Sequence, residues 1–171
     1  MKRRPLLLLS SVFLAVASTC AAASSALYRN VEYGFAVRLP PQASVEQATP
    51  PAPAHGAVVH LASGARIRID GQYDAAFLGS ASAAARRVME DESFDPAVPT
   101  RTVRTAGPSA RCFGRMSDGL LQRRCVVYRR RVEASAIIYT LALDGSAGSP
   151  GSDEAAFDRI VRSFRLEPLP R

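Results

Sequence analysis

Residues 112–125 have the sequence CFGRMSDGLLQRRC, in which two cysteines flank an Asp-Gly pair. Asp-Gly between two strand-like runs is the strongest short signal for a two-residue hairpin turn. Counting outward from a turn at Asp118 and Gly119 places Cys112 directly opposite Cys125. Such a pair is of the non-hydrogen-bonded kind, whose Cα atoms approach to about 4.5 Å, close enough for a disulfide. The sequence therefore predicts an antiparallel hairpin closed by a Cys112–Cys125 disulfide.

A redox pair and a metal site are the alternatives for these two cysteines. A redox pair usually has the spacing Cys-x-x-Cys at a helix start, and a metal site needs further ligands. Neither pattern surrounds Cys112 or Cys125. A structural disulfide also implies an oxidising compartment, because thiols stay reduced in the cytosol.

The N-terminus agrees with that compartment. Residues 2–4 are basic, residues 6–17 are mostly apolar, and residues 21–23 are alanines. This is the architecture of a secretory signal peptide, and its apolar segment is too short to span a bilayer. We predict that residues 1–23 are removed and that residues 24–171 form one domain in the periplasm.

Lipidation of Cys20 is the competing route of processing. The preceding residues, Ala17, Ser18 and Thr19, form a poor lipoprotein signal, which prefers Leu first and Gly or Ala last. We therefore favour soluble export. An envelope lipoprotein anchored through Cys20 is the alternative, and it is the only route by which we expect a membrane partner.

Charge argues against a nucleic-acid partner. The whole chain carries a formal net charge of +7, but three of its 22 basic residues lie in the leader, which leaves 19 basic and 15 acidic residues. The mature chain contains no lysine. An exported protein with a net charge of +4 gives no reason to expect nucleic acid.

Most of the remaining chain is expected to form strands and loops. Residues 24–30 form a polar lead-in, and residues 40–54, with five prolines, are expected to form an extended loop. Expected strands, judged from alternating apolar residues, cover 35–39, 58–61, 65–70, 100–105 and 134–143.

Two helices complete the pattern. Asp74 is expected to cap a helix that continues to about Glu92, and Ser152 to cap a final helix. The final helix has an apolar stripe at i, i+3, i+4 and i+7, formed by Phe157, Ile160, Val161 and Phe164. Hairpin-connected strands with a mid-chain helix and a C-terminal helix predict an α+β fold, an antiparallel sheet on which both helices pack.

Two segments resemble a known family. Residues 33–40, YGFAVRLP, are similar to the opening signature of PsbP-like domains, and residues 157–165, FDRIVRSFR, are similar to their closing helix. The resemblance covers about residues 28–166 and includes the exported bacterial relatives of the DcrB type. It implies a PsbP-like fold and a small, non-catalytic envelope domain that supports or binds another protein. The tryptophan common after the proline of the opening signature is absent, and the resemblance transfers no functional residue to this chain.

The sequence lacks a familiar catalytic constellation. Its only histidines are His55 and His60, and no Gly-x-Ser-x-Gly motif surrounds a serine. The spacing of these histidines and Asp70 matches no recognised metal site, and the acidic run 90–92 lacks the alternating ligands of a calcium loop. We predict no enzymatic activity, no metal and no cofactor.

A basic cluster is the most suggestive surface in the sequence. Arginines of the cysteine hairpin and of the following reversal form a candidate patch for an anionic partner: Arg111, Arg115, Arg129, Arg130 and Arg131. Arg123 and Arg124 are left out because consecutive strand residues point to opposite faces. Charged residues at a sheet edge that prevent aggregation are the alternative interpretation.

These observations predict a non-enzymatic exported protein that binds or supports an envelope or periplasmic protein. A secretion-system immunity protein would be one version of it. The alternative is a carrier of a small ligand or lipid with a pocket between the sheet and the helices.

Overall fold

The computed structural model describes residues 26–47, 55–131 and 136–170. The predicted leader, its cleavage site and Cys20 lie outside these residues. In chain order the elements are β1 (Leu27–Asn30), β2 (Phe35–Arg38), β3 (Ser44–Gln47), β4 (His55–His60), β5 (Arg66–Tyr73), α1 (Ala81–Asp91), β6 (Arg101–Val103), β7 (Ala110–Ser117), β8 (Leu120–Arg129), β9 (Ile137–Asp144), α2 (Pro150–Ser163) and β10 (Arg165–Leu166). None of the helices in this part of the chain is long and apolar enough to cross a membrane.

The cysteine hairpin has the predicted register. Cys112 of β7 lies opposite Cys125 of β8, and a disulfide joins them across a Cα–Cα distance of 4.1 Å. Asp118 and Gly119 both have positive φ angles, 51° and 75°, as the tight hairpin turn requires. The prediction of the disulfide hairpin is therefore confirmed.

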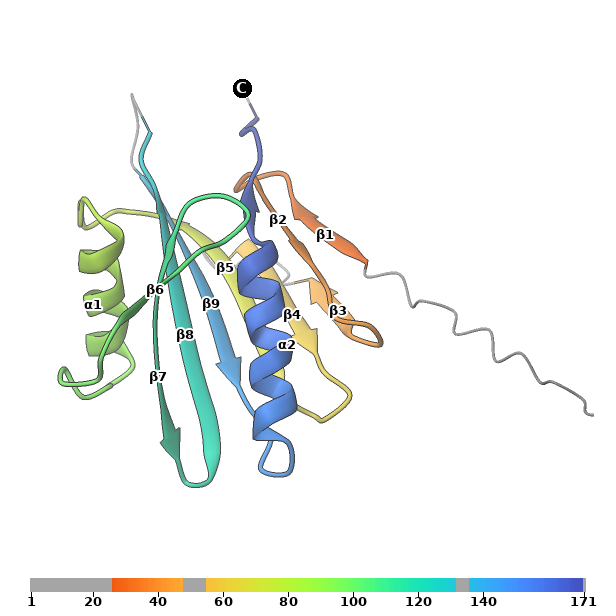
Figure 1. Ribbon diagram of the computed structural model, residues 1–171. Coiled ribbons are helices and arrows are strands. Elements are labelled where there is room, and N and C mark those ends of the chain that lie inside the picture. The colour runs from red at the N-terminus through yellow and green to blue at the C-terminus, as the bar shows by residue number, and fades with distance from the viewer. Residues whose placement is uncertain (1–25, 48–54, 132–135, 171) are drawn as a thin grey trace, which may run out of the picture.

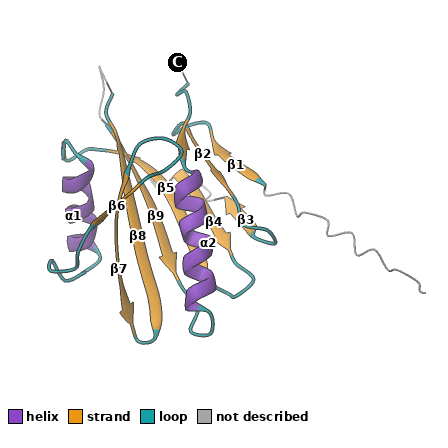
Figure 2. Ribbon diagram, in the orientation of Figure 1, coloured by secondary structure: helices purple, strands orange, loops and turns teal. Residues whose placement is uncertain are grey.

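The hairpin belongs to an antiparallel sheet of seven strands in the order β3-β4-β5-β9-β8-β7-β6 (Figures 1 and 2). A second, smaller sheet has the order β1-β2-β10. The two helices cover opposite faces of the large sheet. Side chains alternate between the two faces along β7 and β8, and those on one face pack toward α2 while those on the other pack toward α1. The predicted α+β class, with a mid-chain helix and a C-terminal helix on an antiparallel sheet, is confirmed.

The main core lies between the large sheet and α2. The apolar stripe of α2 is almost fully buried, and Phe164 stacks on Phe35 of β2 with ring centroids 5.6 Å apart. Tyr139 of β9 packs edge-on against both rings and donates its hydroxyl proton to the carbonyl oxygen of Tyr33, at 2.7 Å. A smaller core on the other face joins α1 to the sheet through Met89, Phe94, Phe113, Val126 and Ile138.

The start of the mid-chain helix was predicted wrongly. Helix α1 begins at Ala81, and the side chain of Ser80 caps it by accepting a hydrogen bond from the Ala83 amide. Asp74 instead holds a loop, since its Oδ2 accepts hydrogen bonds from the Leu78 amide and the Tyr128 hydroxyl. The aspartate signal was real, but it stabilises a turn in place of a helix start.

Two short strands and the start of the final helix also differ from the expectation. The predicted lead-in contains β1, and the predicted proline-rich loop contains β3, which pairs with β4. Both are four-residue strands at sheet edges, where pairing geometry outweighs the weak local pattern. Helix α2 begins at Pro150, two residues before the predicted cap Ser152, because proline suits the first helical turn.

Candidate functional site

Two consecutive arginines of β8 point to opposite faces of the sheet and contact different helices. Arg123 faces α2 and Arg124 faces the α1 side, and the two residues are only 7% and 4% exposed. Buried guanidinium groups are costly unless they are paired and hydrogen-bonded. The contacts of each therefore indicate whether it has a structural role or is available to a ligand.

Arg124 is fully engaged. Its Nε donates to Glu92 Oε2 at 2.7 Å, its Nη2 donates to Asp144 Oδ1 at 3.0 Å, and its Nη1 donates to the Leu143 and Arg123 carbonyls. Glu92 is the C-cap residue that follows α1, so Arg124 connects the end of this helix to the sheet. The chemistry of Arg124 is structural.

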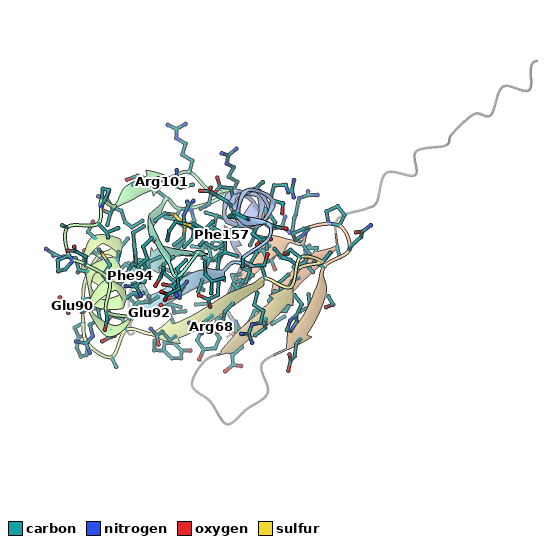
Figure 3. All side chains as sticks on the ribbon, turned by 90° about the horizontal axis from the view of Figure 1, so that it is seen from below. Arg68, Glu90, Glu92, Phe94, Arg101 and Phe157 are labelled. Carbon is teal, nitrogen blue, oxygen red and sulfur yellow. A yellow bond between two sulfur atoms is a disulfide. The ribbon has the colours of Figure 1, made fainter. Side chains whose placement is uncertain are left out.

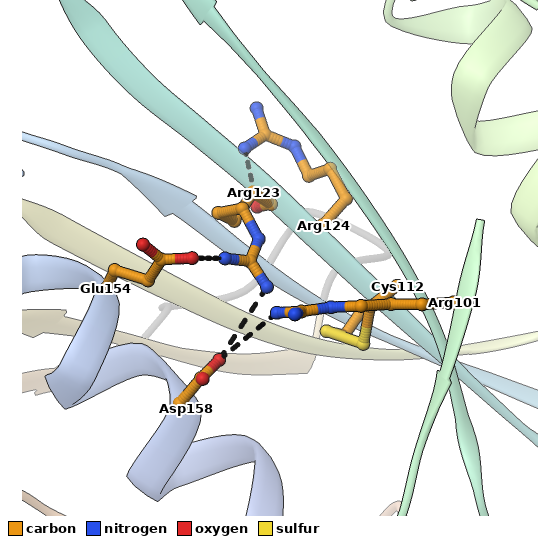
Figure 4. The surroundings of a disulfide bond; sticks show 7 residues. Arg101, Cys112, Arg123, Arg124, Glu154 and Asp158 are labelled. Atoms are coloured by element: carbon orange, nitrogen blue, oxygen red, sulfur yellow. Dashed lines mark hydrogen bonds and ion pairs between the residues drawn. A yellow bond between two sulfur atoms is a disulfide. The ribbon is translucent and has the colours of Figure 1, made fainter. Parts of the chain in front are cut away.

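Arg123 is less completely satisfied. Its Nη1 donates to Glu154 of α2, while its Nη2 lies 3.6 Å from Asp158 Oδ1, too far for a hydrogen bond. Among the described residues Nη2 has no hydrogen-bond partner although it is buried. Asp158 also lies 3.8 Å from Nη2 of Arg101, so two guanidinium groups converge on one carboxylate (Figure 4).

Gly114 makes the position of Arg123 possible. The two residues face each other between β7 and β8, and the Arg123 side chain crosses the space that a Cβ of residue 114 would occupy. That Cβ would lie 2.4 Å from Arg123 Cδ and 2.6 Å from the Gln122 carbonyl oxygen. A glycine is therefore required wherever this arginine lies flat on the sheet.

Electrostatics at this place favour an additional anion. Burial lowers the pKa of Arg123, the neighbouring Arg101 guanidinium lowers it further, and Asp158 opposes both effects. A second carboxylate or a phosphate near the two guanidinium groups would compensate for the desolvated charge.

A cavity of about 320 Å³ opens beside these groups. Figure 3 shows Arg101 at the outer rim of the molecule, away from Phe94 and Glu92 near α1. The lining residues come from the segment before β6, from β6, β7 and β8, and from α2: Pro99, Arg101, Cys112, Phe113, Gly114, Arg115, Met116, Leu121, Arg123 and Glu154. We call this the arginine cleft.

The edge of β7 beside the cleft is open. Strand β6 pairs with β7 only from Ala110 to Cys112, and no described strand pairs with β7 beyond Cys112 on that side. Pro99, which precedes β6, has no N–H with which to extend the ladder. Because Cys112 and Cys125 form a non-hydrogen-bonded pair, the peptide groups of Gly114 and Met116 point away from β8. Met116 itself is 58% exposed.

The structure does not bring the five arginines of the predicted patch together. Arg111 and Arg115 lie on the α1 face of β7, where Arg111 donates to Ser82 Oγ at 3.1 Å. Arg115 donates to the Ser93 carbonyl at 2.7 Å, and its guanidinium lies 4.2 Å from the centre of the Phe94 ring. These contacts attach α1 and the segment after it to the sheet.

The other three members of the patch lie elsewhere. Arg129 is on the opposite face of β8, where its Nη1 donates to the Glu167 carbonyl at 2.9 Å. Arg130 and Arg131 follow the end of β8, and the guanidinium of Arg131 lies 6.0 Å from the centre of the Tyr73 ring. Only Arg115 of the five lines the arginine cleft.

The remaining candidates are dispersed. His60 pairs with Glu46 at 3.2 Å on an exposed edge, and His55 is the first residue of β4. Asp70 pairs with Arg68 at 2.8 Å, and Glu92 pairs with Arg124. No group of three or more His, Cys, Asp or Glu side chains in the described part of the chain could hold a metal ion.

Sequence reasoning missed most of the arginine cleft. Arg101, Gly114, Glu154 and Asp158 were not singled out, although two signals were present. The hairpin register places Gly114 opposite Arg123, and Glu154 and Asp158 lie four residues apart on one face of the final helix. The alternation argument for Arg123 and Arg124 was correct.

Comparisons with known proteins identify the fold. No protein-family model matches the sequence, and no curated protein matches it significantly. Cyanobacterial PsbP (CyanoP) from Synechocystis sp. PCC 6803 matches with a TM-score of 0.57 and 14% identity, over 92% of this chain and 98% of that one. LpqN, described as involved in cell envelope biogenesis of Mycobacterium tuberculosis, matches with a TM-score of 0.57 and 12% identity, over 85% of this chain and 91% of that one.

These similarities define the class of protein. The chain is an α+β domain with the PsbP-like fold, as its segments YGFAVRLP and FDRIVRSFR indicated. At 12–14% identity the similarity concerns the fold, so the residues of the arginine cleft must be interpreted on their own chemistry.

Proposed function

We propose that the protein is a non-enzymatic, exported accessory protein that binds another protein of the cell envelope. The observation that carries this proposal is the open edge of β7 beside the arginine cleft. An unpaired strand edge offers backbone donors and acceptors, and addition of a strand to such an edge is a common mode of protein recognition. The cleft side chains offer hydrogen-bond donors and apolar contacts, which are means of binding.

Three further observations support the envelope as the location. The N-terminal sequence has the pattern of a secretory signal, and the Cys112–Cys125 disulfide suits an oxidising compartment. A structural neighbour, LpqN, is described as involved in cell envelope biogenesis. A secretion-system immunity protein, which holds a toxin inactive, remains one version of such an accessory protein.

Affinity capture with a variant of the strand edge tests the proposal. The full-length protein, tagged at its C-terminus, is captured from its native envelope after mild crosslinking, alongside the variant Met116→Pro. Because the Met116 amide points away from β8, proline removes an edge donor without removing a bond of the hairpin. We expect a partner that wild type captures and the variant loses, while both proteins have the same melting temperature. Equal capture by the two proteins, or no captured protein, would contradict the proposal.

A small-ligand carrier is the second candidate, and the cavity against α2 favours it. A cavity of about 320 Å³ is at the small end of ligand sites, which span about 300–1,000 Å³. Native mass spectrometry of gently purified protein tests it, because a carrier retains mass beyond that of the polypeptide. A spectrum of the polypeptide alone would exclude a tightly held ligand.

A further inference from the structure

The arginine cleft and the open edge of β7 lie next to each other, and the direction of β7 determines which end of an added strand would lie at the cleft. Strand β7 runs from Ala110 to Ser117, so its paired start lies next to Arg101 and its open part lies beyond Cys112. A segment that adds antiparallel to the open part therefore has its C-terminal end toward Arg101. At that end the segment would meet the start of β6 and the two guanidinium groups.

We propose that the arginine cleft binds the free C-terminus of a partner protein, which pairs antiparallel with Gly114 and Met116 and places its terminal carboxylate between Arg101 and Arg123. The inference rests on the proposed function and specifies what the partner presents. Capture of a terminal carboxylate combined with strand addition is an established mode of peptide recognition in proteins generally.

The charges of the cleft are complementary to a carboxylate. Arg123 is 93% buried by its 7% exposure, and its Nη2 has no hydrogen-bond partner among the described residues. Arg101 is more than half exposed and lies 3.8 Å from Asp158, so its guanidinium keeps donors available. On the α2 side of the sheet the charged residues that line the cavity are Arg101, Arg123 and Glu154, while the guanidinium of Arg115 lies on the α1 side, over the Phe94 ring. A carboxylate can accept hydrogen bonds from both guanidinium groups at once.

The backbone and the apolar lining are complementary to an extended chain. The peptide groups of Gly114 and Met116 point out of the hairpin, two residues apart, which is the spacing that an antiparallel partner strand pairs with. Exposed Met116 and half-buried Leu121 offer apolar contacts beside this edge. An isolated phosphate would use the arginines and leave the edge unpaired.

Binding of matched peptides tests the proposal. The probe is a synthetic pool of short, N-terminally labelled peptides with random β-branched and aromatic residues, prepared with a C-terminal carboxylate and, separately, with a C-terminal carboxamide. Fluorescence anisotropy measures affinity, and NMR of the isotope-labelled protein maps the site. We expect the carboxylate pool to bind roughly tenfold more tightly, because hydrogen bonds to a charged group are about twice as strong as neutral ones. The largest shifts should occur at the Gly114 and Met116 amides and at Arg123 Nε.

Substitution of Arg101 distinguishes the contribution of the terminal carboxylate to affinity from the contribution of strand pairing. Arg101→Gln should reduce affinity for the carboxylate pool to nearly that for the carboxamide pool. Arg104→Gln is the matched control, since Arg104 is exposed, lies three residues away and does not line the cleft. This variant makes the same change of charge and should leave the preference unchanged.

Three outcomes would overturn the inference, and each has a different meaning for the proposed function. Equal binding of the two pools at the β7 edge would show that the terminal carboxylate does not contribute to affinity, while strand addition at this edge would still stand. Displacement by inorganic phosphate, with shifts only at Arg101 and Arg123, would make the cleft a plain anion site. No binding of either pool would contradict the proposal that the cleft binds a peptide C-terminus. The capture experiment with Met116→Pro would still test the proposed function independently.

Discussion

Gly114 and Arg123 lie opposite each other, and the absence of a side chain at Gly114 determines where the Arg123 side chain can lie. The Arg123 side chain lies over the place where any other residue at position 114 would carry its Cβ. In this position it reaches Glu154 of α2 on one side and the cleft on the other. A single glycine thus connects the hairpin register to the packing of α2 and to the proposed binding site.

Gly114→Ala should destabilise the protein by roughly 1–3 kcal/mol, the usual cost of overpacking, because its Cβ would lie 2.6 Å from a backbone oxygen. Urea denaturation measures the free energy of unfolding. Gly148→Ala is the control, since a Cβ there meets no atom within 4 Å. Equal stability of the two variants would mean that neither the Arg123 side chain nor the Gln122 carbonyl crowds the Cβ position of residue 114.

The raised pKa of Tyr139 makes the free energy of unfolding depend on pH in the alkaline range. Burial raises the pKa of Tyr139 above its ordinary value of 10.0, and the nearby Arg129 partly opposes this. Above pH 10 the unfolded tyrosine loses its proton while the folded one keeps it, so the free energy of unfolding falls as pH rises. Tyr139→Phe should be less stable at neutral pH and should lose less stability between about pH 9.5 and 11. Equal slopes for wild type and variant would contradict this role of Tyr139.

At the level of elements, the Cys112–Cys125 bond fixes the hairpin that carries both sides of the cleft. Cys112 lines the cleft, and its neighbours Gly114 and Arg123 depend on the same register. A one-residue slip of β7 against β8 would move Gly114 away from its place opposite Arg123 and put a side chain there. The disulfide therefore holds the site as well as the strands.

Removal of both cysteines, as Cys112→Ala with Cys125→Ala, should lower the free energy of unfolding by about 2–3 kcal/mol, the value for closing a short loop. Urea denaturation of the oxidised wild type and the double variant checks this. The variant should also lose affinity for the carboxylate pool, since its register is held less firmly. A double variant with wild-type stability would show that strand pairing alone fixes the hairpin.

The elements that the sequence predicted correctly are those with long, regular signals. The Asp-Gly turn, the two cysteines and the apolar stripe of α2 each follow from spacing alone, because two-residue turns and helical periods leave little freedom. Helix α1 was placed too early because Asp74 satisfies loop amides and a tyrosine hydroxyl in preference to a helix start. Strands β1 and β3 are short edge strands whose pairing depends on residues far away in the sequence.

The predicted arginine patch shows the limit of composition as a guide to sites. Arginines close in sequence were grouped, yet Arg111 and Arg129 face opposite sides of the sheet and contact different elements. The cleft instead joins Arg101 and Arg123 with carboxylates from α2, which only the folded chain brings together.

At the level of the whole molecule, the fold presents one open strand edge next to a partly satisfied buried charge. The PsbP-like fold supplies a sheet covered by a helix on each face, and the edge strand β6 begins only at Arg101, opposite Cys112. These features meet where β7 passes the cleft. They carry the proposal that this domain binds a partner chain.

The predicted leader is tested by the intact mass of the protein from its native envelope, with and without reductant. A start at Ser24 and a gain of two hydrogens on reduction are expected for soluble export with the Cys112–Cys125 bond intact. A start at Cys20 with attached acyl mass would establish the lipoprotein route, and the partner would then be sought at the membrane surface. A chain that begins at Met1 would contradict both routes of export.

Photo-crosslinking tests directly whether the open edge of β7 binds another protein. A photoreactive residue replaces Met116 in the full-length protein in its native envelope, and a second protein carries it in place of Glu90, an exposed residue of α1. We expect a defined crosslink to another protein from position 116 and none of the same mass from position 90. Equal products from both positions, or a product formed only with a second copy of this chain, would contradict the claim that the β7 edge binds an envelope protein.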